Sequence, residues 1–282
     1  ARGLVELTPS ASRPQPSRAL APSVHALAMM HAPTFPRPPG RPDLLRLVSF
    51  LDLTTLEPTD TEAKVERLCQ RALRPLPHHP DVTVAAVCVY PSLLSAAKRV
   101  LEGSPVKLAS VAGAFPTGLS PLDVKVFEVR RALDLGAQEI DTVILRGAML
   151  EGDEAKVFDE LSSLREACGS ATMKVILETG ELGSEERIRR ASDIALRAGA
   201  DFLKTSTGKI ATGATLEATR PMLEALRDHE RKSGKRVGIK VAGGIRKADQ
   251  ALAFVDLVRD VLGEGWLTPS LFRIGASSLL DD

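Results

Sequence analysis

Eight short runs rich in Val, Ile and Leu alternate along the chain with longer stretches whose apolar residues recur every three or four positions. The short runs predict buried parallel strands, and the longer spacing is that of amphipathic helices. Regular alternation of the two predicts a parallel sheet with right-handed crossovers. The expected strands are 48–53, 84–90, 107–113, 139–145, 173–179, 201–207, 237–243 and 272–276, and the expected helices include 61–73, 121–137, 184–200 and 215–234.

Eight such units favour a closed (β/α)8 barrel, the TIM barrel, over an open α/β sheet. A barrel of this kind takes roughly 250 residues, and residues 41–282 supply that length. No GxGxxG sequence follows the first strand, so a doubly wound dinucleotide-binding fold has little support. Only SSLLDD follows the last strand, which predicts a truncated eighth helix.

Residues 1–40 differ from the rest because they hold 8 of the 19 prolines and a single acidic residue, Glu6. Proline lacks an amide donor and interrupts helices and sheets. We therefore expect an irregular N-terminal extension at 1–40 and a barrel domain at 41–282. The Arg, Ser and Ala content of the extension leaves a targeting role open.

Composition argues against several kinds of partner. The formal net charge is +1 with no basic stripe, so a nucleic-acid surface is not expected. The chain contains no run of 18 apolar residues, so no membrane span is expected. The three cysteines, Cys69, Cys88 and Cys168, are odd in number and widely spaced, which favours a reducing, cytoplasmic location. Composition does not determine the oligomeric state, and a homo-oligomer is one of the possibilities.

Among the charged residues that lie within predicted apolar strands, three stand out: Asp141, Lys204 and Lys240. Burying a charge is costly unless the charge is paired or used. Active sites in such barrels form at the C-terminal ends of the strands, and alternate strands contribute side chains to one inner layer. Asp141 on the fourth strand and Lys204 on the sixth are therefore expected to face one another.

This trio suits Schiff-base chemistry. A lysine amine has a pKa of about 10.4 and must lose its proton to attack a carbonyl carbon. Burial and a second nearby cation both lower that pKa, and Lys240 on the neighbouring strand is placed to be the cation. Asp141 is placed to move protons. The alternative is that each lysine points outward and pairs with a helix acid.

The loops after the seventh and eighth strands read VAGG (241–244) and GASS (275–278), and these two loops form a recurrent phosphate site in barrels. Gly243 and Gly244 allow backbone amides to approach an anion closely. Ser277 and Ser278 add hydroxyls and the amides of a helix N-terminus. Gly208 offers a similar tight turn near Lys204. Ordinary turn glycines and a helix cap are the alternative interpretation.

Several strings in this order resemble the deoxyribose-phosphate aldolase family from about Ser49 to Leu280: SFLDLTTLEPTDT, VAAVCVYP, EIDTVI, KVILETGELG, DFLKTSTGK, VAGGIR and FRIGASSLL. The resemblance implies a Schiff base on Lys204, a pKa-lowering role for Lys240 and a proton relay through Asp141. It implies reversible cleavage of 2-deoxy-D-ribose 5-phosphate to D-glyceraldehyde 3-phosphate and acetaldehyde, without metal or cofactor.

The resemblance also implies a binding set and its support. The substrate- and phosphate-binding residues are Asp52, Cys88, Thr207, Gly208, Lys209, Gly243, Gly244, Ser277 and Ser278, and the supporting residues are Thr205 and Glu178. Asp52 is expected to contact a substrate hydroxyl. For Cys88, a packed core thiol is the alternative. Some family members end in a tail with a tyrosine that assists proton transfer, whereas Tyr90 is the one tyrosine here, so reduced catalytic efficiency is expected.

Three other functions stay open. A metal-dependent aldolase needs a histidine cluster near the strand ends, whereas the five histidines lie in the extension, a loop and a helix end. A different lysine aldolase or a transaldolase would share the chemistry of Lys204. A barrel that binds a phosphorylated metabolite without catalysis would not need the trio.

Overall fold

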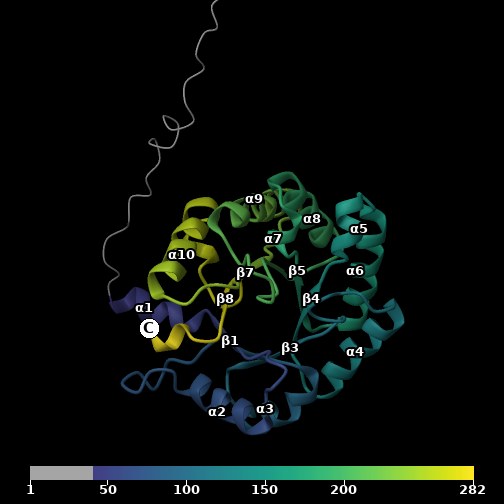
Figure 1. Ribbon diagram of the computed structural model, residues 1–282. Coiled ribbons are helices and arrows are strands. Elements are labelled where there is room, and N and C mark those ends of the chain that lie inside the picture. Colours follow the sequence, from purple (N-terminus) through teal and green to yellow (C-terminus); the bar gives the residue numbers. More distant parts are fainter. Residues whose placement is uncertain (1–40) are drawn as a thin grey trace, which may run out of the picture. The chain divides into compact units, whose positions relative to one another are not determined.

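In the computed structural model, which describes residues 41–282, eight parallel strands form a closed barrel in the order β1 to β8, with helices around it (Figure 1). The ring closes where β8 pairs with β1. The predicted (β/α)8 fold is therefore confirmed. The strands are β1 (Leu51–Thr54), β2 (Ala86–Val89), β3 (Lys107–Val111), β4 (Glu139–Val143), β5 (Thr172–Ile176), β6 (Phe202–Lys204), β7 (Gly238–Ala242) and β8 (Phe272–Ala276).

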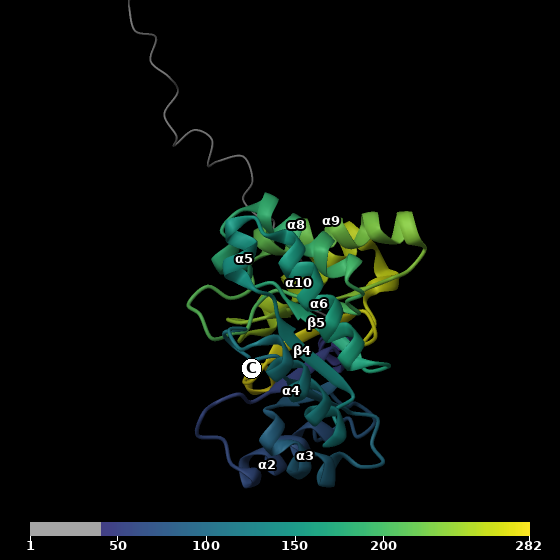
Figure 2. The same cartoon turned by 90° about the vertical axis from the view of Figure 1, so that its right-hand side faces the viewer.

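Ten α-helices lie among the described residues, and in the side view α2 and α3 occupy the opposite edge of the barrel from α8 and α9 (Figure 2). They are α1 (Arg41–Ser49), α2 (Glu62–Leu73), α3 (Leu94–Leu101), α4 (Leu122–Asp134), α5 (Arg146–Glu151), α6 (Glu154–Cys168), α7 (Thr179–Leu182), α8 (Glu185–Arg197), α9 (Leu216–Ser233) and α10 (Ala248–Leu262). None of these helices is both long enough and apolar enough to cross a membrane.

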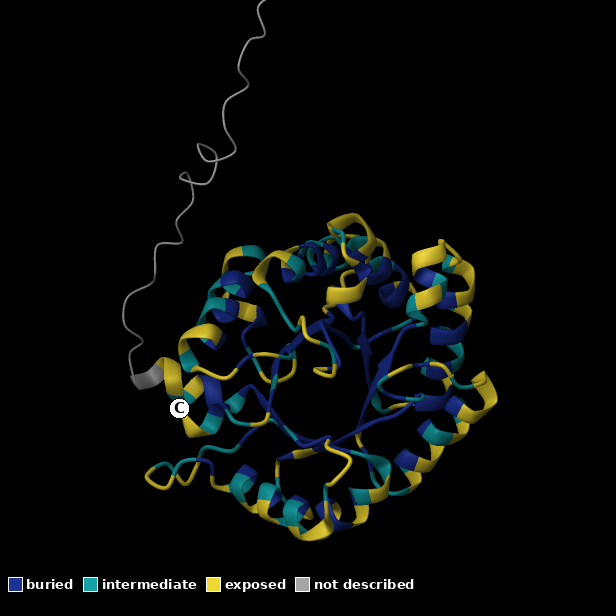
Figure 3. Ribbon diagram, in the orientation of Figure 1, coloured by how far each residue is buried: buried dark blue, intermediate teal, exposed yellow. Residues whose placement is uncertain are grey.

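Burial follows the expected pattern: the strands are mostly buried, and the exposed residues lie on the outer sides of the helices and in the loops (Figure 3). Helix starts are set locally. Ser184 caps α8 by accepting a hydrogen bond from the amide of Arg187 at 3.3 Å, as its position before two glutamates predicts. The apolar spacing and the capping residues thus predict the same helices, and the apolar faces of these helices pack on the barrel.

The predicted first strand began three residues too early. Residues 48 and 49 end helix α1, and β1 starts at Leu51. In α1, Leu47 and Val48 are buried at helical spacing from Leu44, so tertiary packing turned an ambiguous apolar run into a helix. Most other predicted strands ran one to three residues too far at their C-terminal ends, where the site loops begin.

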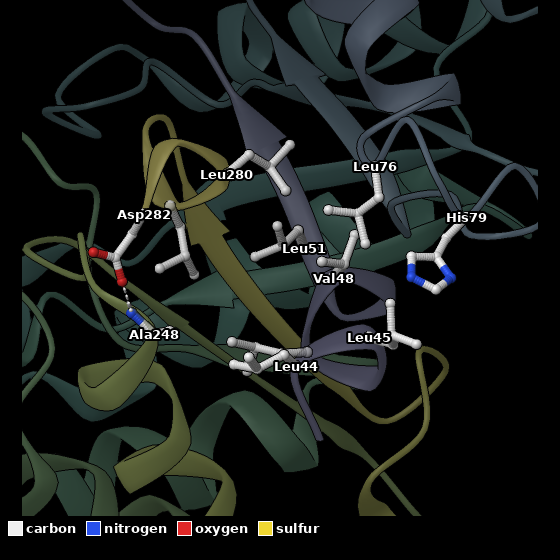
Figure 4. Close-up of a pocket in the computed structure, with 11 residues that line it drawn as sticks. Leu44, Leu45, Val48, Leu51, Leu76, His79, Ala248, Leu280 and Asp282 are labelled. Carbon is white, nitrogen blue, oxygen red and sulfur yellow. Dashed lines mark hydrogen bonds between the residues drawn. The ribbon is translucent and has the colours of Figure 1, made fainter. Parts of the chain in front are cut away.

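Within the described residues, β8 is followed by a single 3₁₀ turn, η4 (Leu279–Asp281). Helix α1 lies in the ring between α10 and α2 (Figure 1). Beside it is an open, mainly apolar cavity of about 290 Å³ between α1 and η4 (Figure 4). Residues 1–40, including the predicted extension, lie outside the described residues.

Candidate active site

Lys204, Lys240 and Asp141 meet inside the barrel. Lys204 and Lys240 are register partners on β6 and β7. Both amines donate to the same oxygen, Oδ2 of Asp141, at 2.8 Å each. All three side chains are buried, so neither lysine points outward into the helix layer.

Further charged side chains extend this cluster. Lys174 on β5 lies 2.8 Å from Oδ1 of Asp141 and 2.6 Å from Oε2 of Glu139. Arg273 on β8 pairs with Glu139 at 2.9 Å. Lys174, Glu139 and Arg273 were missed in the sequence, although they too are charges inside apolar strands, the signal that identified Asp141.

Asp52 on β1 also belongs to this charged layer. One carboxylate oxygen lies 2.6 Å from Nη1 of Arg273, and the other lies 2.5 Å from Nζ of Lys240. The second contact is an ion pair without hydrogen-bond geometry. Asp52 is fully buried and does not line the pocket described below, so its charge faces the cluster.

The balance of charge in the cluster singles out one lysine. Three carboxylates (Asp52, Glu139, Asp141) face four basic groups (Lys174, Lys204, Lys240, Arg273), which leaves one basic group without a matching charge. Burial lowers the pKa of Lys204, and the nearby Lys240 adds to this against the opposing charge of Asp141. Lys204 is thus the amine that holds its proton least firmly.

The pKa values of the other two lysines, Lys240 and Lys174, are shifted upward instead. Burial lowers the pKa of Lys240, but the carboxylates of Asp141 and Asp52 outweigh burial and raise it above the usual value. For Lys174, burial is likewise outweighed by Asp141 and Glu139, so its pKa is raised. The pKa of Asp141 lies well below its usual value because three lysines overcome the effect of burial. Lys204 is therefore the group in this layer that loses its proton most readily, among ion pairs that stay charged.

A pocket of about 470 Å³ opens above this layer at the C-terminal end of the barrel. Its lining contains most of the predicted site residues: Thr207, Lys209, Gly208, Gly243, Gly244, Ser277, Lys204 and Lys240. Ser278, at the start of η4, lies outside this lining, as do Cys88, Thr205 and Glu178. Arg246 also lines the pocket and was missed, because it follows the glycine pair in a loop without a strand signal.

Glycines let the two loops around this pocket touch. Gly208, Gly243 and Gly244 all have positive φ, from 76° to 90°. A Cβ on Gly213 would stand 2.2 Å from the carbonyl oxygen of Gly243, so the loop after β6 packs backbone to backbone on the loop after β7. The amide of Ala214 donates to that same oxygen at 3.0 Å. The predicted turn glycines therefore shape the pocket together with Gly213, which was missed.

Thr205 and Glu178 hold this rim in place from behind. The Thr205 hydroxyl donates to the carbonyl of Ala242 and accepts from its amide, at 3.1 and 3.0 Å. Glu178, buried with a positive φ of 56°, accepts from the amide and hydroxyl of Thr207 at 3.2 and 2.5 Å. The amide of Lys209 donates to the Thr207 hydroxyl at 3.1 Å. The Thr207 hydroxyl is thus engaged within the protein.

An apolar wall faces the other side of Lys204. The ring centroid of Phe115 lies 6.0 Å from the Lys204 amine, and Tyr90 packs edge-on to Phe115. Cys88 is fully buried in this wall, and burial raises the pKa of its thiol to about 11. Cys88 therefore matches the packed core thiol that the sequence left as an alternative.

Among residues 41–282, no group of three or more His, Cys, Asp or Glu side chains is arranged to hold a metal ion. His78 and His79 lie between α2 and β2, and His229 lies in α9. The polar side chains that line the mouth of the barrel include amines, hydroxyls, the guanidinium of Arg246 and the carboxylate of Glu57.

Comparison with known proteins agrees with this geometry. Residues 46–282 match the DeoC/LacD family aldolase. The deoxyribose-phosphate aldolases of Homo sapiens and Mus musculus are 46% and 47% identical to this chain over 250 residues, covering 85% of it and 79% of each relative. A deoxyribose phosphate aldolase from Aeropyrum pernix, described as a unique tetrameric structure, aligns with TM-score 0.65 and 29% identity over 86% of this chain and 97% of its own. This chain therefore belongs to the DeoC/LacD family of aldolases.

Proposed function

We propose that this chain is a deoxyribose-phosphate aldolase, which cleaves 2-deoxy-D-ribose 5-phosphate reversibly to D-glyceraldehyde 3-phosphate and acetaldehyde. The observation that carries the proposal is a single pocket with two different ends. At its floor lies the amine of Lys204, in a cluster with one more basic group than carboxylates, and at its rim lie glycine loops and cationic side chains. A substrate with an aldehyde at one end and a phosphate at the other suits this pocket, with the aldehyde at Lys204 and the phosphate at the rim.

The neutral amine of Lys204 attacks the aldehyde carbon of the open-chain sugar, and loss of water leaves a protonated imine. A base takes the proton of the 3-hydroxyl, the C2–C3 bond breaks, and its electron pair moves into the imine to form an enamine. Glyceraldehyde 3-phosphate leaves. Protonation at C2 and hydrolysis then release acetaldehyde and restore the amine.

Asp141 and Lys240 are the residues we assign to proton transfer and to tuning Lys204. Oδ2 of Asp141 lies 2.8 Å from both amines, so Asp141 is placed to exchange a proton with Lys204 while Lys240 stays paired with the same oxygen. Lys240 keeps its own proton, held by two carboxylates, and so stays the second cation. The three residues titrate as a unit.

The phosphate is assigned to the rim. Backbone amides at Gly208, Gly243 and Gly244, with Ser277 and Ser278, suit an anion because the glycines allow close approach. Lys209, which lies 3.0 Å from Glu57, and Arg246 supply positive charge. Thr205, Thr207 and Glu178 shape the rim. Contacts of Asp52 with a substrate hydroxyl and of Cys88 with the substrate stay predictions.

Three wider proposals accompany this function. The division into an extension at 1–40 and a barrel at 41–282 rests on the proline content of the first segment. A cytoplasmic location is supported by three unpaired cysteines, all buried. A homo-oligomer is supported by the tetrameric relative from Aeropyrum pernix.

The test is reductive trapping. The protein is incubated with 2-deoxyribose 5-phosphate and sodium borohydride, and the added mass is located by peptide mass spectrometry. We expect the reduced adduct on Lys204 and its loss in Lys204→Ala, whereas Lys235→Ala, which removes an exposed surface lysine, keeps it. An adduct confined to other lysines would contradict the site assignment. Folded protein that forms no adduct and cleaves no substrate would favour a barrel that only binds a phosphorylated metabolite.

A further inference from the structure

An ion pair between two loops crosses the mouth of the pocket above Lys204. Nζ of Lys209, in the loop after β6, lies 3.0 Å from Oε1 of Glu57, in the loop after β1. Both residues line the pocket. In the closed barrel, β7 and β8 lie between β6 and β1, so the pair reaches across the strands whose loops we assign to the substrate phosphate (Figure 1).

We propose that Glu57 competes with the substrate phosphate for Lys209 and thereby sets how tightly this pocket holds a phosphorylated sugar. The inference rests on the proposed function, which places the phosphate at the rim. The carboxylate pairs with the amine before substrate binds, and the phosphate displaces it. Because the product glyceraldehyde 3-phosphate keeps the phosphate group, the returning carboxylate also favours release of that product.

The side chain of Glu57 is weakly held, whereas its backbone is fixed. The side chain is 59% exposed, and Lys209 is its one ion-pair partner in the described part of the chain. The amide of Glu57 donates to the carboxylate of Asp60 at 2.9 Å, and its carbonyl oxygen accepts from the amide of Asp60 at 3.0 Å. An exposed ion pair contributes little free energy, so rotation of the Glu57 side chain frees Lys209 without moving the loop.

Lys209 is held more firmly than its partner. Its side chain is 25% exposed, and its amide donates to the Thr207 hydroxyl at 3.1 Å. The amide of Thr207 in turn donates to the buried carboxylate of Glu178 at 3.2 Å. Displacement therefore removes the carboxylate of Glu57 and leaves the cation in the pocket, where it meets the phosphate.

The charge at the rim matches a phosphate only after this displacement. Three cationic side chains line the rim, those of Lys64, Lys209 and Arg246. Lys64 pairs with Asp60 and Lys209 pairs with Glu57, whereas Arg246 forms no ion pair within residues 41–282. The rim thus carries one uncompensated positive charge. A phosphate ester carries a charge of about −1.5 to −2 at pH 7, so its second negative charge is matched only when Lys209 leaves Glu57.

The alternative is that the ion pair supports the shape of the rim. The two roles predict opposite effects, because removal of a competitor tightens phosphate binding and removal of a support loosens it. The loop after β6 already packs backbone to backbone on the loop after β7, through Gly213 and Gly243, and the amide of Ala214 donates to Gly243 at 3.0 Å. The shape of the rim therefore does not depend on Glu57, which favours competition.

The first experiment titrates the full chain with inorganic phosphate in a calorimeter. We expect Glu57→Gln to bind phosphate roughly two- to fivefold more tightly than the wild type, the size expected for release of an exposed ion pair. Glu62→Gln is the matched control, because its side chain is 62% exposed and does not line the pocket, and it should bind phosphate as the wild type does. Equal or weaker binding by Glu57→Gln, or no binding by either protein, would overturn the proposal.

A double variant tests whether the competition acts through Lys209. Lys209→Met should weaken phosphate binding, and adding Glu57→Gln to it should change nothing further, because the contested amine is gone. A gain of the same size in both backgrounds would mean that Glu57 repels phosphate directly, and it would refute the competition. These titrations need no catalysis, so their failure is distinguishable from failure of the aldolase function, which reductive trapping on Lys204 tests.

Steady-state kinetics supply a readout that a structural role would not move. For Glu57→Gln we expect the KM for 2-deoxyribose 5-phosphate to fall by the factor found in the titration. The ratio of kcat/KM for this substrate to kcat/KM for unphosphorylated 2-deoxyribose should rise by a similar factor. Thermal unfolding checks that each variant is folded. A ratio that stays at the wild-type value in folded Glu57→Gln would contradict the proposal.

Discussion

Lys204 and Lys240, which are register partners on adjacent strands, donate to one and the same oxygen of Asp141 at 2.8 Å. One carboxylate oxygen cannot fully neutralise the charge of two ammonium groups. Lys240 also faces Asp52 at 2.5 Å, whereas Lys204 has no second carboxylate among the described residues and opens to the pocket. The asymmetry of partners decides which lysine becomes the nucleophile.

Removal of the second cation is expected to shift the pH dependence of the reaction. Without Lys240, Lys204 loses a repelling cation and shares Asp141 with Lys174 only, so the pKa of Lys204 rises and less neutral amine is present at pH 7. For Lys240→Met we expect kcat/KM at pH 7 to fall by about two orders of magnitude and the rising limb of its pH profile to move to higher pH. Lys240→Arg keeps the charge and should keep the limb in place. An unmoved limb in Lys240→Met would show that Lys240 does not tune Lys204.

Lys174 is expected to matter for stability. Its loss leaves Glu139 and Asp141 buried with one cation fewer, and breaking a buried pair costs about 3–5 kcal/mol. Lys174→Met should therefore lower the melting temperature by roughly 6–20 °C. Adding Glu139→Gln removes the stranded charge and should recover part of the loss in a double-mutant cycle. Lys107→Met, at an exposed residue of β3, serves as control. Additive losses would mean that the two side chains do not interact.

Gly213→Ala is expected to damage the phosphate end alone. The new Cβ would lie 2.2 Å from the Gly243 carbonyl oxygen, so one loop must move. We expect the KM for 2-deoxyribose 5-phosphate to rise about tenfold, while kcat/KM for unphosphorylated 2-deoxyribose stays near the wild-type value. Gly147→Ala on α5 has open space around it and should behave as wild type. Equal losses on both substrates would contradict the assignment of the rim to phosphate.

Stability is expected to fall in acid through the charged layer. The pKa of Asp141 is lowered in the folded protein, so its contribution is complete above the unfolded pKa of about 3.9 and is lost as pH falls toward the folded pKa. The free energy of unfolding should therefore decrease below about pH 5. Asp141→Asn should be less stable at pH 7 but lose less between pH 5 and pH 3 in urea unfolding. Asp159→Asn, at an exposed residue of α6, is the control. Parallel curves for Asp141→Asn and wild type would assign the acid sensitivity to other carboxylates.

The sequence by itself determined the elements and the reactive trio. Strand and helix periods are local properties, so eight strands and the main helices followed from residue spacing alone. Asp141, Lys204 and Lys240 could be found because a charge inside an apolar strand is visible without a fold. The same signal was present at Lys174, Glu139 and Arg273, but nothing in the sequence said which inward-pointing charges would meet.

Tertiary structure decided which charged side chains and which loop residues come into contact. Closure of β8 onto β1 brings Arg273 within 2.6 Å of Asp52, although 221 residues separate them. Strand register placed three lysines around Asp141, and that count of neighbours, set by barrel geometry, makes Lys204 the weakly protonated one. Likewise, the contact between Gly213 and Gly243 depends on how two loops pack, which residue spacing does not encode.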